Sequence, residues 1–454
     1  MTLLLCNMIY RTNPITIVLL ILCTINTALN AQVPNTQKLD SLLQYFANNN
    51  KFMGSLSITH QQQTVYQQNF GIAHIDNADT LKANATSKYR IGAISQLFTA
   101  TMIFQLIEAK KLDLNTKLAK FYPKIPNANK ITISDLLHHR SGLHNFTNDS
   151  LYRSTTQTQS KKELLALFEK MPTDFERDYQ TAYSNTNYVL LGYIIEKISK
   201  KSYADNLQKR ICKKLNLKNT YYSNQINAQN NEVDSYVFNN RQWQIVPETD
   251  LSTLHGAGAI VATPKDLNTF IRALFNGKLI NPKSLDALNE LKAQIGRGIL
   301  PMNFEEQIGY GHKGSIDGFS ATLTYFPEHD LAVAFCSNGI NYKMSDILTA
   351  ILSQCYDKPY QYPAFTSLNL NDEQLKMYEG IYAAPNFPLK ITISTQNQQL
   401  VAQASGQPAF SLEALSETEF KFDLAGVRLL FAPENNTMTM TLKQGNSNIK
   451  MTRE

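Results

Sequence analysis

Residues 89–100 read Tyr89-Arg90-Ile91-Gly92-Ala93-Ile94-Ser95-Gln96-Leu97-Phe98-Thr99-Ala100 and open a long apolar run. Apolar side chains recur on most faces of the helix that this run predicts, over about residues 93–109. A helix that is apolar all round is buried inside its protein. We therefore expect this helix at the centre of a domain, with Ala93 and Gln96 in its first turn.

Strands lie at both ends of the surrounding domain, and helices lie between them. An alternating hairpin is expected at 54–59 and 65–70, and further strands at 256–263, 308–314, 318–326 and 331–337. Helices are expected at 132–138, 161–169, 187–199, 203–214, 264–276 and 343–355. Because the sheet draws its strands from distant parts of the chain, the pattern predicts an α+β fold rather than repeated βαβ units.

The chain beyond residue 355 has a different pattern. A linker is expected at 356–367, where two prolines interrupt a segment without periodicity. Short alternating runs then recur at 378–382, 389–394, 399–404, 418–424, 426–431, 437–442 and 447–452. They predict a small antiparallel barrel or sandwich over 368–454, with a tight turn at Gly445-Asn446. The length of 454 residues also favours two domains, which we expect at 33–355 and 368–454.

Four further motifs accompany residues 89–100, each weak alone but specific as an ordered set. They are Tyr183-Ser184-Asn185, Gly311-His312-Lys313-Gly314, Leu136-Leu137-His138-His139-Arg140-Ser141-Gly142-Leu143, and Gly256-Ala257-Gly258 with Ala262-Thr263-Pro264-Lys265-Asp266-Leu267. Through them, most of residues 50–355 resembles the serine β-lactamase and penicillin-binding-protein superfamily. The likeness is to its class C β-lactamase-like group of D-alanyl-D-alanine peptidases and esterases. It implies an antiparallel sheet flanked by helices, followed by a lipocalin-like β-barrel domain.

The resemblance gives the start of the helix a chemical meaning. In this family the segment reads Gly-Ser-x-Ser-Lys, where the first Ser is the nucleophile and the Lys helps to deprotonate it. In this sequence the nucleophile position is Ala93 and the base position is Gln96. A methyl group cannot attack a carbonyl, and a neutral amide cannot take a proton at neutral pH. We therefore expect the scaffold of the family without its two central reactive groups.

Other positions of the cleft keep the residue types that the family uses. The resemblance implies that Tyr183 acts as a general base or proton shuttle and that Asn185 holds the substrate amide. It also implies His312 on an edge strand, and Gly314 just before the backbone N–H of Ser315, which would be half of an oxyanion hole. These residues predict a cleft that can still bind and orient a ligand.

Two groups are candidates to replace the lost pair. Ser95 lies two helical positions beyond Ala93, about 200° round the axis, so it should point away from the cleft and serve in packing or capping. Tyr183 could activate a water, but a phenol with a pKa of about 10 needs positive neighbours to ionise near neutral pH. Lys313 would supply such a charge only if its strand turned it toward the site.

The N-terminal segment 1–31 has the pattern of a signal peptide. Arg11 is its only charged residue, residues 15–22 form an apolar run too short to span a bilayer, and Ala31 closes a cleavage site. Removing the segment leaves a net charge of +5 from the +6 of the whole chain. We expect an exported protein, periplasmic or extracellular, that contacts a membrane only if this segment is retained.

Charge and residue clusters give little support to other classes of partner. A net charge of +6 is mild for 454 residues, so no nucleic-acid partner is expected. The sequence holds neither HExxH nor CxxC, so no metal, no cofactor and no disulfide framework are expected. The sequence leaves the oligomeric state open.

Two classes of function follow, and a third stays open. The first is a catalytically inactive or impaired homologue that binds a peptide, a cell-wall fragment or a small acyl compound in a degenerate cleft. The second is an active esterase, amidase, peptidase or β-lactamase that uses Ser95 or a water activated by Tyr183. The third is a scaffold that holds partners through the C-terminal domain.

Overall fold

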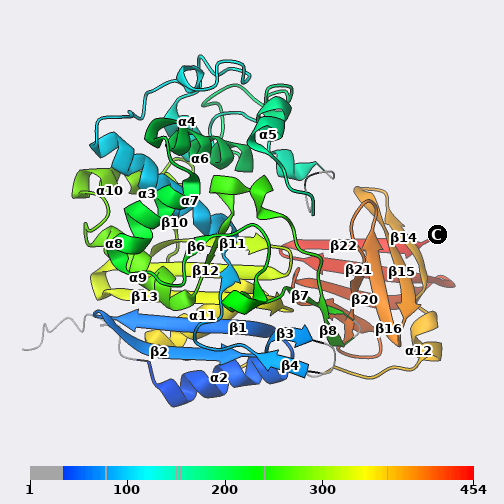
Figure 1. Ribbon diagram of the computed structural model, residues 1–454. Helices are drawn as coiled ribbons and strands as arrows, with labels where there is room; N and C mark the ends of the chain where they lie inside the picture. The colour runs from blue at the N-terminus through cyan, green and yellow to red at the C-terminus, as the bar shows by residue number, and fades with distance from the viewer. Residues whose placement is uncertain (1–33, 77–78, 150–151, 153–155, 240, 366) are drawn as a thin grey trace, which may run out of the picture.

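The computed structural model describes residues 34–454, apart from 77–78, 150–151, 153–155, 240 and 366 (Figure 1). The expected signal peptide lies outside these residues. Within the described part of the chain, every helix falls short of the length and apolar character that a bilayer-spanning segment needs. In the described part of the chain, two large β-sheets lie side by side, with most of the helices gathered around the first. Two smaller sheets have two and three strands.

The first sheet joins an N-terminal hairpin to strands that come more than 200 residues later. The hairpin is β1 (Phe52–His60) and β2 (Gln63–Phe70), and the later strands are β10 (Leu300–Pro301), β11 (Tyr310–Ile316), β12 (Phe319–Phe326) and β13 (Leu331–Ile340). Their order is β10-β11-β12-β13-β1-β2, antiparallel throughout. A short hairpin, β7 (Tyr236–Asn239) and β8 (Gln242–Ile245), is attached to the end of β13. The α+β prediction is confirmed.

Helices cover both faces of this sheet. The face with Leu323, Ala334 and Cys336 packs against α3 (Ser95–Glu108), α6 (Asn185–Ser199) and α9 (Pro264–Phe275). The opposite face, with Val333 and Phe335, packs against α2 (Thr36–Asn48) and α11 (Met344–Cys355). Since side chains alternate along a strand, β13 can bury both of its faces only because it is apolar at nearly every position. Figure 1 shows α2 lying beneath the β1–β2 hairpin, on the side away from α3 and α6.

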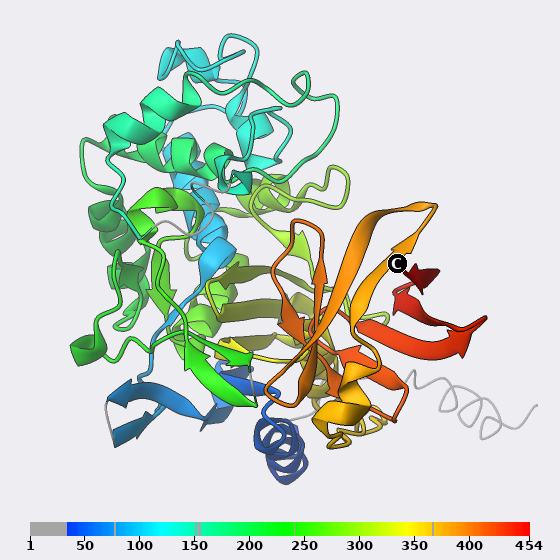
Figure 2. The same cartoon turned by 90° about the vertical axis from the view of Figure 1, so that its right-hand side faces the viewer.

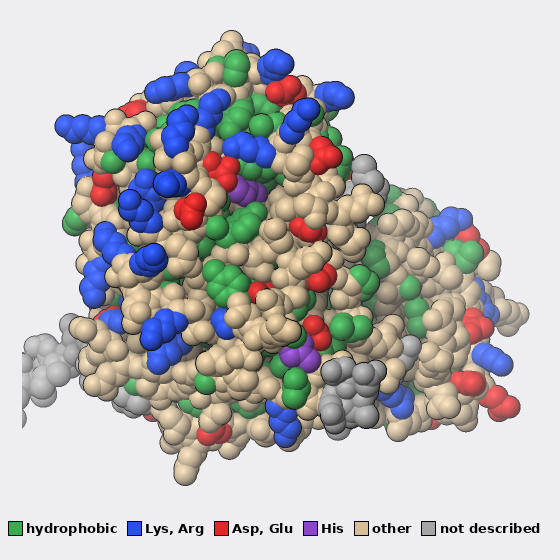
Figure 3. All heavy atoms as spheres, viewed as in Figure 1, with side chains coloured by type: hydrophobic (Ala, Val, Ile, Leu, Met, Phe, Trp, Pro, Cys, Tyr) green, Lys and Arg blue, Asp and Glu red, His purple; other side chains and the backbone are tan. Residues whose placement is uncertain are grey.

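Local sequence signals explain where several helices begin. Thr263 caps α9 by accepting from the backbone N–H of Asp266, and Pro264 occupies the first turn. Capping boxes start α4 (Ile133–Leu137) and α5 (Lys161–Phe168). Lys and Arg side chains cover much of the surface around α4, α8 (Lys213–Leu215) and α10 (Pro282–Asn289), interspersed with acidic residues (Figure 3).

Three expected elements differ from the structure. The helix expected at 93–109 begins as a 3-10 turn, η1 (Gly92–Ile94), before α3 starts. The strand expected at 256–263 is confined to β9 (Ile260–Ala262), because Gly256 packs directly on the backbone of α6 in a 3-10 turn. The helix expected at 203–214 is divided into α7 (Tyr203–Leu207), the π-helical turn η4 (Gln208–Cys212) and α8.

The C-terminal sheet has nine antiparallel strands that curve into a nearly closed barrel (Figure 2). Its order is β17-β16-β15-β14-β22-β21-β20-β19-β18. The strands are β14 (Gly380–Ala384), β15 (Phe387–Gln396), β16 (Gln399–Ala404), β17 (Phe410–Ser411), β18 (Glu413–Ala414), β19 (Glu419–Phe422), β20 (Val427–Glu434), β21 (Thr437–Gln444) and β22 (Ser447–Arg453). A short helix, α12 (Asp372–Lys376), precedes them. Gly445, at a φ of +56°, forms the expected turn between β21 and β22. The domain boundaries at 355 and 368 stay predictions.

Candidate active site

The candidate site lies where η1 meets β11. A Cβ on Gly314 would lie 1.9 Å from the backbone oxygen of Ile91 and 2.9 Å from the backbone nitrogen of Ala93. A Cβ on Gly92, whose φ is +50°, would lie 2.8 Å from the backbone nitrogen of Ser315. Only glycine allows two backbones to approach this closely, and only glycine adopts that φ without strain. The two glycines therefore bring Ala93 and Ser315 to the same corner of the fold.

Ser95 takes no part in this corner. Its side chain is fully buried, and its Oγ accepts a hydrogen bond from the backbone N–H of Ile260 at 3.2 Å. The hydroxyl thus helps to hold α3 against β9. A nucleophile needs a base within hydrogen-bond reach, and the recorded partner of Ser95 is a backbone amide instead.

Gln96 lies at the centre of the site, fully buried, and joins three polar side chains. Its Nε2 donates to the Tyr183 hydroxyl at 2.6 Å and lies 3.4 Å from Asn185 Oδ1. Its Oε1 lies 3.2 Å from His139 Nε2. The Tyr183 hydroxyl in turn donates to Asn185 Oδ1 at 2.8 Å. The fold therefore brings Gln96 next to three residues that lie 43, 87 and 89 positions further along the chain.

The protons in this network have fixed positions because a backbone amide sets the histidine tautomer. The N–H of Ser184 donates to His139 Nδ1 at 3.1 Å, so Nδ1 carries no proton and Nε2 must carry one. The Nε2–H of His139 therefore donates to Gln96 Oε1, and the Gln96 amide donates onward to Tyr183. Every group in this series of hydrogen bonds, which runs from the Ser184 amide through His139, Gln96 and Tyr183 to Asn185, is neutral and already has a hydrogen-bond partner.

Burial keeps these groups neutral at physiological pH. Desolvation lowers the pKa of His139 to about 3, with a smaller contribution from the nearby charge of His312. Desolvation also raises the pKa of Tyr183 above its ordinary value, and the hydrogen bond from Gln96 offsets only part of that rise. Tyr183 is nevertheless 43% exposed, so part of it remains open to solvent. Neither group can take a proton from a nucleophile near pH 7.

The loop around η3 (Phe146–Asn148) holds Asn185 in place. Asn185 Nδ2 donates to Thr147 Oγ1 at 2.9 Å, and the Asn185 backbone N–H donates to Asn145 Oδ1 at 2.9 Å. Thr147 was not predicted from the sequence. The available signal was the group of polar residues Asn145, Thr147 and Asn148 shortly after the Ser-Gly-Leu motif.

His144 ties the same loop to the rest of the fold. Its Nδ1 lies 2.7 Å from Asp174 Oδ1, and its Nε2 lies 3.3 Å from Asp149 Oδ1. Partial burial lowers the pKa of His144, but the hydrogen bonds and charges of Asp174 and Asp149 outweigh it, and the pKa is raised overall. The protonated ring can donate to both carboxylates at once, which holds the loop in place.

His312 and Lys313 lie on opposite faces of β11. His312 is buried on the face that Gly314 turns toward η1, and its Nδ1 lies 2.7 Å from the Lys313 carbonyl oxygen. Desolvation lowers the pKa of His312 to about 4, so the ring is neutral near pH 7. Lys313 is exposed. Since it alternates with His312 along the strand, its ammonium points away from the network around Gln96.

Known proteins share the fold and part of the sequence of this chain. The Beta-lactamase family model matches residues 44–353. The teichoic acid D-alanine hydrolase of Staphylococcus aureus strain MRSA252 is 24% identical over 341 residues, which are 73% of this chain and 81% of that protein. The D-amino acid amidase of Ochrobactrum anthropi SV3, crystallised with D-phenylalanine, superposes with a TM-score of 0.62 at 23% identity, over 70% of this chain and 99% of the amidase.

Some solved structures resemble almost the whole chain. The octameric penicillin-binding-protein homologue of Pyrococcus abyssi superposes with a TM-score of 0.63 at 21% identity. The match covers 92% of this chain and all of the other, so it includes most of the C-terminal sheet as well. At this level of identity the likeness concerns the fold alone.

Proposed function

The chain belongs to the Beta-lactamase family, and from that premise we propose that it binds a ligand in the family cleft without forming an acyl-enzyme. The ligand would be a peptide, a cell-wall fragment or a small acyl compound. Acyl transfer on a serine needs a nucleophile and a group that accepts its proton. The neutral network centred on Gln96 is the observation that carries the proposal, because it supplies neither.

The same network supports binding. Tyr183 and Asn185 present a phenol and an amide to the cleft, each held in one orientation by Gln96 or Thr147. The approach of η1 to β11 puts the backbone nitrogens of Ala93 and Ser315 at one corner, where their N–H groups could receive a carbonyl oxygen. A ligand with a carbonyl and an amide would satisfy both sets of groups.

The named relatives suggest which carbonyl compounds to test first. One is a teichoic acid D-alanine hydrolase and another is a D-amino acid amidase. Amides and esters of D-alanine and D-phenylalanine are therefore the first candidate ligands. Peptides that end in D-alanine, which resemble cell-wall fragments, are the second set.

Calorimetric titration with intact ligand, followed by product analysis, tests this function. We expect saturable binding, no product, and weaker binding by Asn185→Ala. Turnover that disappears in Tyr183→Phe would instead establish general-base hydrolysis by a water next to Tyr183. A variant that lacks residues 368–454 tests the scaffold function. If this deletion abolished binding of a protein partner and left ligand binding in the cleft unchanged, the protein would be a scaffold.

We also propose that the protein works outside the cytoplasm, in the periplasm or the extracellular space. The basis is the apolar segment at 15–22 and the cleavage site ending at Ala31. Cell fractionation with N-terminal sequencing tests this proposal. We expect a mature chain that begins at residue 32, and an intact cytoplasmic chain would contradict it.

A further inference from the structure

A second cavity lies far from the cleft, where the two sheets meet. It has a volume of about 520 Å³ and is lined by the β7–β8 hairpin, the end of β13 and the C-terminal sheet. Small-molecule sites occur preferentially at domain interfaces, in clefts of about 300–1,000 Å³ lined by apolar side chains and a few polar groups. The cavity meets this description, and the proposed function makes no use of it.

The walls of the cavity are mainly apolar. Phe238 and Ile340 contribute from the first sheet, and Phe410, Phe422 and Leu424 contribute from the C-terminal sheet. The rings of Phe410 and Phe422 are stacked, with centroids 4.4 Å apart and an angle of 20° between their planes. Such walls favour a ligand with an apolar or aromatic body, because burying that body removes apolar surface from water on both partners.

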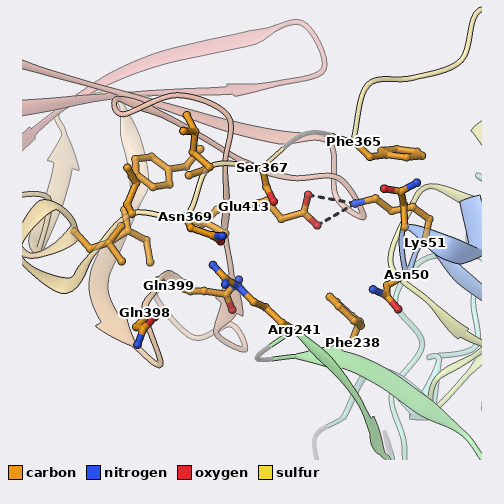
Figure 4. A pocket seen from close by; sticks show the side chains of 18 of the residues that line it. Asn50, Lys51, Phe238, Arg241, Phe365, Ser367, Asn369, Gln398, Gln399 and Glu413 are labelled. Carbon is orange, nitrogen blue, oxygen red and sulfur yellow. Dashed lines mark hydrogen bonds and ion pairs between the residues drawn. The ribbon is translucent and has the colours of Figure 1, made fainter.

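The ionic groups at the junction largely neutralise one another. Lys51, the residue before β1, and Lys421 of β19 are 2% and 3% exposed, and both approach the Phe365 ring. Lys51 pairs with Glu413 at 2.9 Å, and Lys421 pairs with Asp423 at 2.6 Å. Figure 4 shows the Lys51–Glu413 pair spanning the gap between the two sheets. Two buried cations matched by two carboxylates leave no net charge for a ligand to balance.

Arg241 is the exception. It lies at the tip of the β7–β8 hairpin and lines both this cavity and a neighbouring one of about 270 Å³. In Figure 4 its guanidinium reaches toward Gln399 of the C-terminal sheet. No carboxylate of the described residues lies within ion-pair distance of it, and the buried Oε1 of Gln399 has no hydrogen-bond partner. The junction therefore presents one unmatched positive charge beside apolar walls.

We propose that this cavity binds an amphipathic carboxylate. The carboxylate would pair with Arg241, whose planar guanidinium can donate two parallel hydrogen bonds to it. The apolar or aromatic body would lie between Phe238 and the stacked pair of Phe410 and Phe422. A ligand in this position contacts both sheets, so it would strengthen their association.

Trp243 offers a direct test, because it is the chain's single tryptophan and lies next to the cavity. Its ring is 5.1 Å from that of Phe238, in an edge-to-face arrangement. We expect a saturable change in tryptophan fluorescence on titration with 4-phenylbutyrate or octanoate. The uncharged 4-phenylbutanol should bind at least about tenfold more weakly, which is about 1.4 kcal/mol, because it cannot form the charge-assisted pair with Arg241. Comparing the two acids distinguishes an aromatic body from an aliphatic one.

Two variants and one control make the test decisive. Arg241→Gln should reduce the affinity for the acid to that for the alcohol. Leu424→Glu, at a side chain that is 42% exposed, should repel the acid without disturbing the fold. Arg428→Gln changes an exposed arginine of β20 outside the cavity and should bind like the original chain. Any of three results would overturn the proposal. They are equal affinity for acid and alcohol, no saturable signal, or unchanged binding in Arg241→Gln when its unfolding midpoint is also unaltered.

Discussion

Replacing Gln96 with methionine tests the hydrogen-bond network on which the account depends. Methionine has a similar length and shape, so Gln96→Met removes the amide and leaves the packing of α3 nearly unchanged. The Nε2–H of His139 then has no acceptor, and His139 is 3% exposed. An unsatisfied buried donor costs about 1–3 kcal/mol. Tyr183 also loses a donor, but it is 43% exposed and water can replace the amide, which adds at most about 1 kcal/mol.

The free energy of unfolding should therefore fall by about 1–4 kcal/mol. Urea unfolding followed by far-UV circular dichroism measures this change as a lower midpoint, by up to about 1 M. Gln105→Met is the matched control on the same helix. The Oε1 of Gln105 is buried without a partner and its Nε2 makes only two long contacts, so that change should cost less than about 1 kcal/mol. Equal midpoints for the two variants would refute the proton assignment at His139.

Three other predictions concern the cleft. The double variant Ala93→Ser with Gln96→Lys should be acylated slowly by a generic ester probe, as measured by release of the leaving group. Ala93→Ser alone lacks a base and should stay unreactive in the same assay. Asp174→Asn should destabilise the protein at pH 5.5 more than at pH 8.5 in urea unfolding. The raised folded-state pKa of His144 stabilises the fold fully below about pH 6.5, and that stabilisation is lost as the pH rises through the folded value. Gly314→Ala should cost about 2 kcal/mol or more and abolish ligand binding in calorimetry, since its Cβ would lie 1.9 Å from a backbone oxygen just before η1.

Much of the fold could be predicted from the sequence because its elements have strong local signals. The hairpin at 54–70 alternates along most of its length, and α9 begins with a Thr cap and a Pro. The strands β17 and β18 were missed because two residues each are too few to establish a period. The 3-10 turn at Gly92 was missed because it depends on close packing against Gly314, 222 residues later.

The candidate site could be predicted only in part. The family resemblance, rather than the residue pattern itself, indicated that Gln96, Tyr183 and Asn185 would share a cleft. The motif at 136–143, which contains His139, gave no reason to connect that residue with Gln96. That connection depends on the Ser184 amide, which fixes the proton on His139. Hydrogen bonds between distant segments leave no periodic trace in a sequence, so the tautomer and its consequence required coordinates.

The most direct test of the central claim is the intact mass of the protein after incubation with a labelled penicillin and with a fluorophosphonate. If no serine in the cleft can be activated, the mass stays that of the unmodified chain at every time point, while an active serine hydrolase treated in parallel gains one label. A stoichiometric adduct, mapped to Ser95 and absent from Ser95→Ala, would contradict the account.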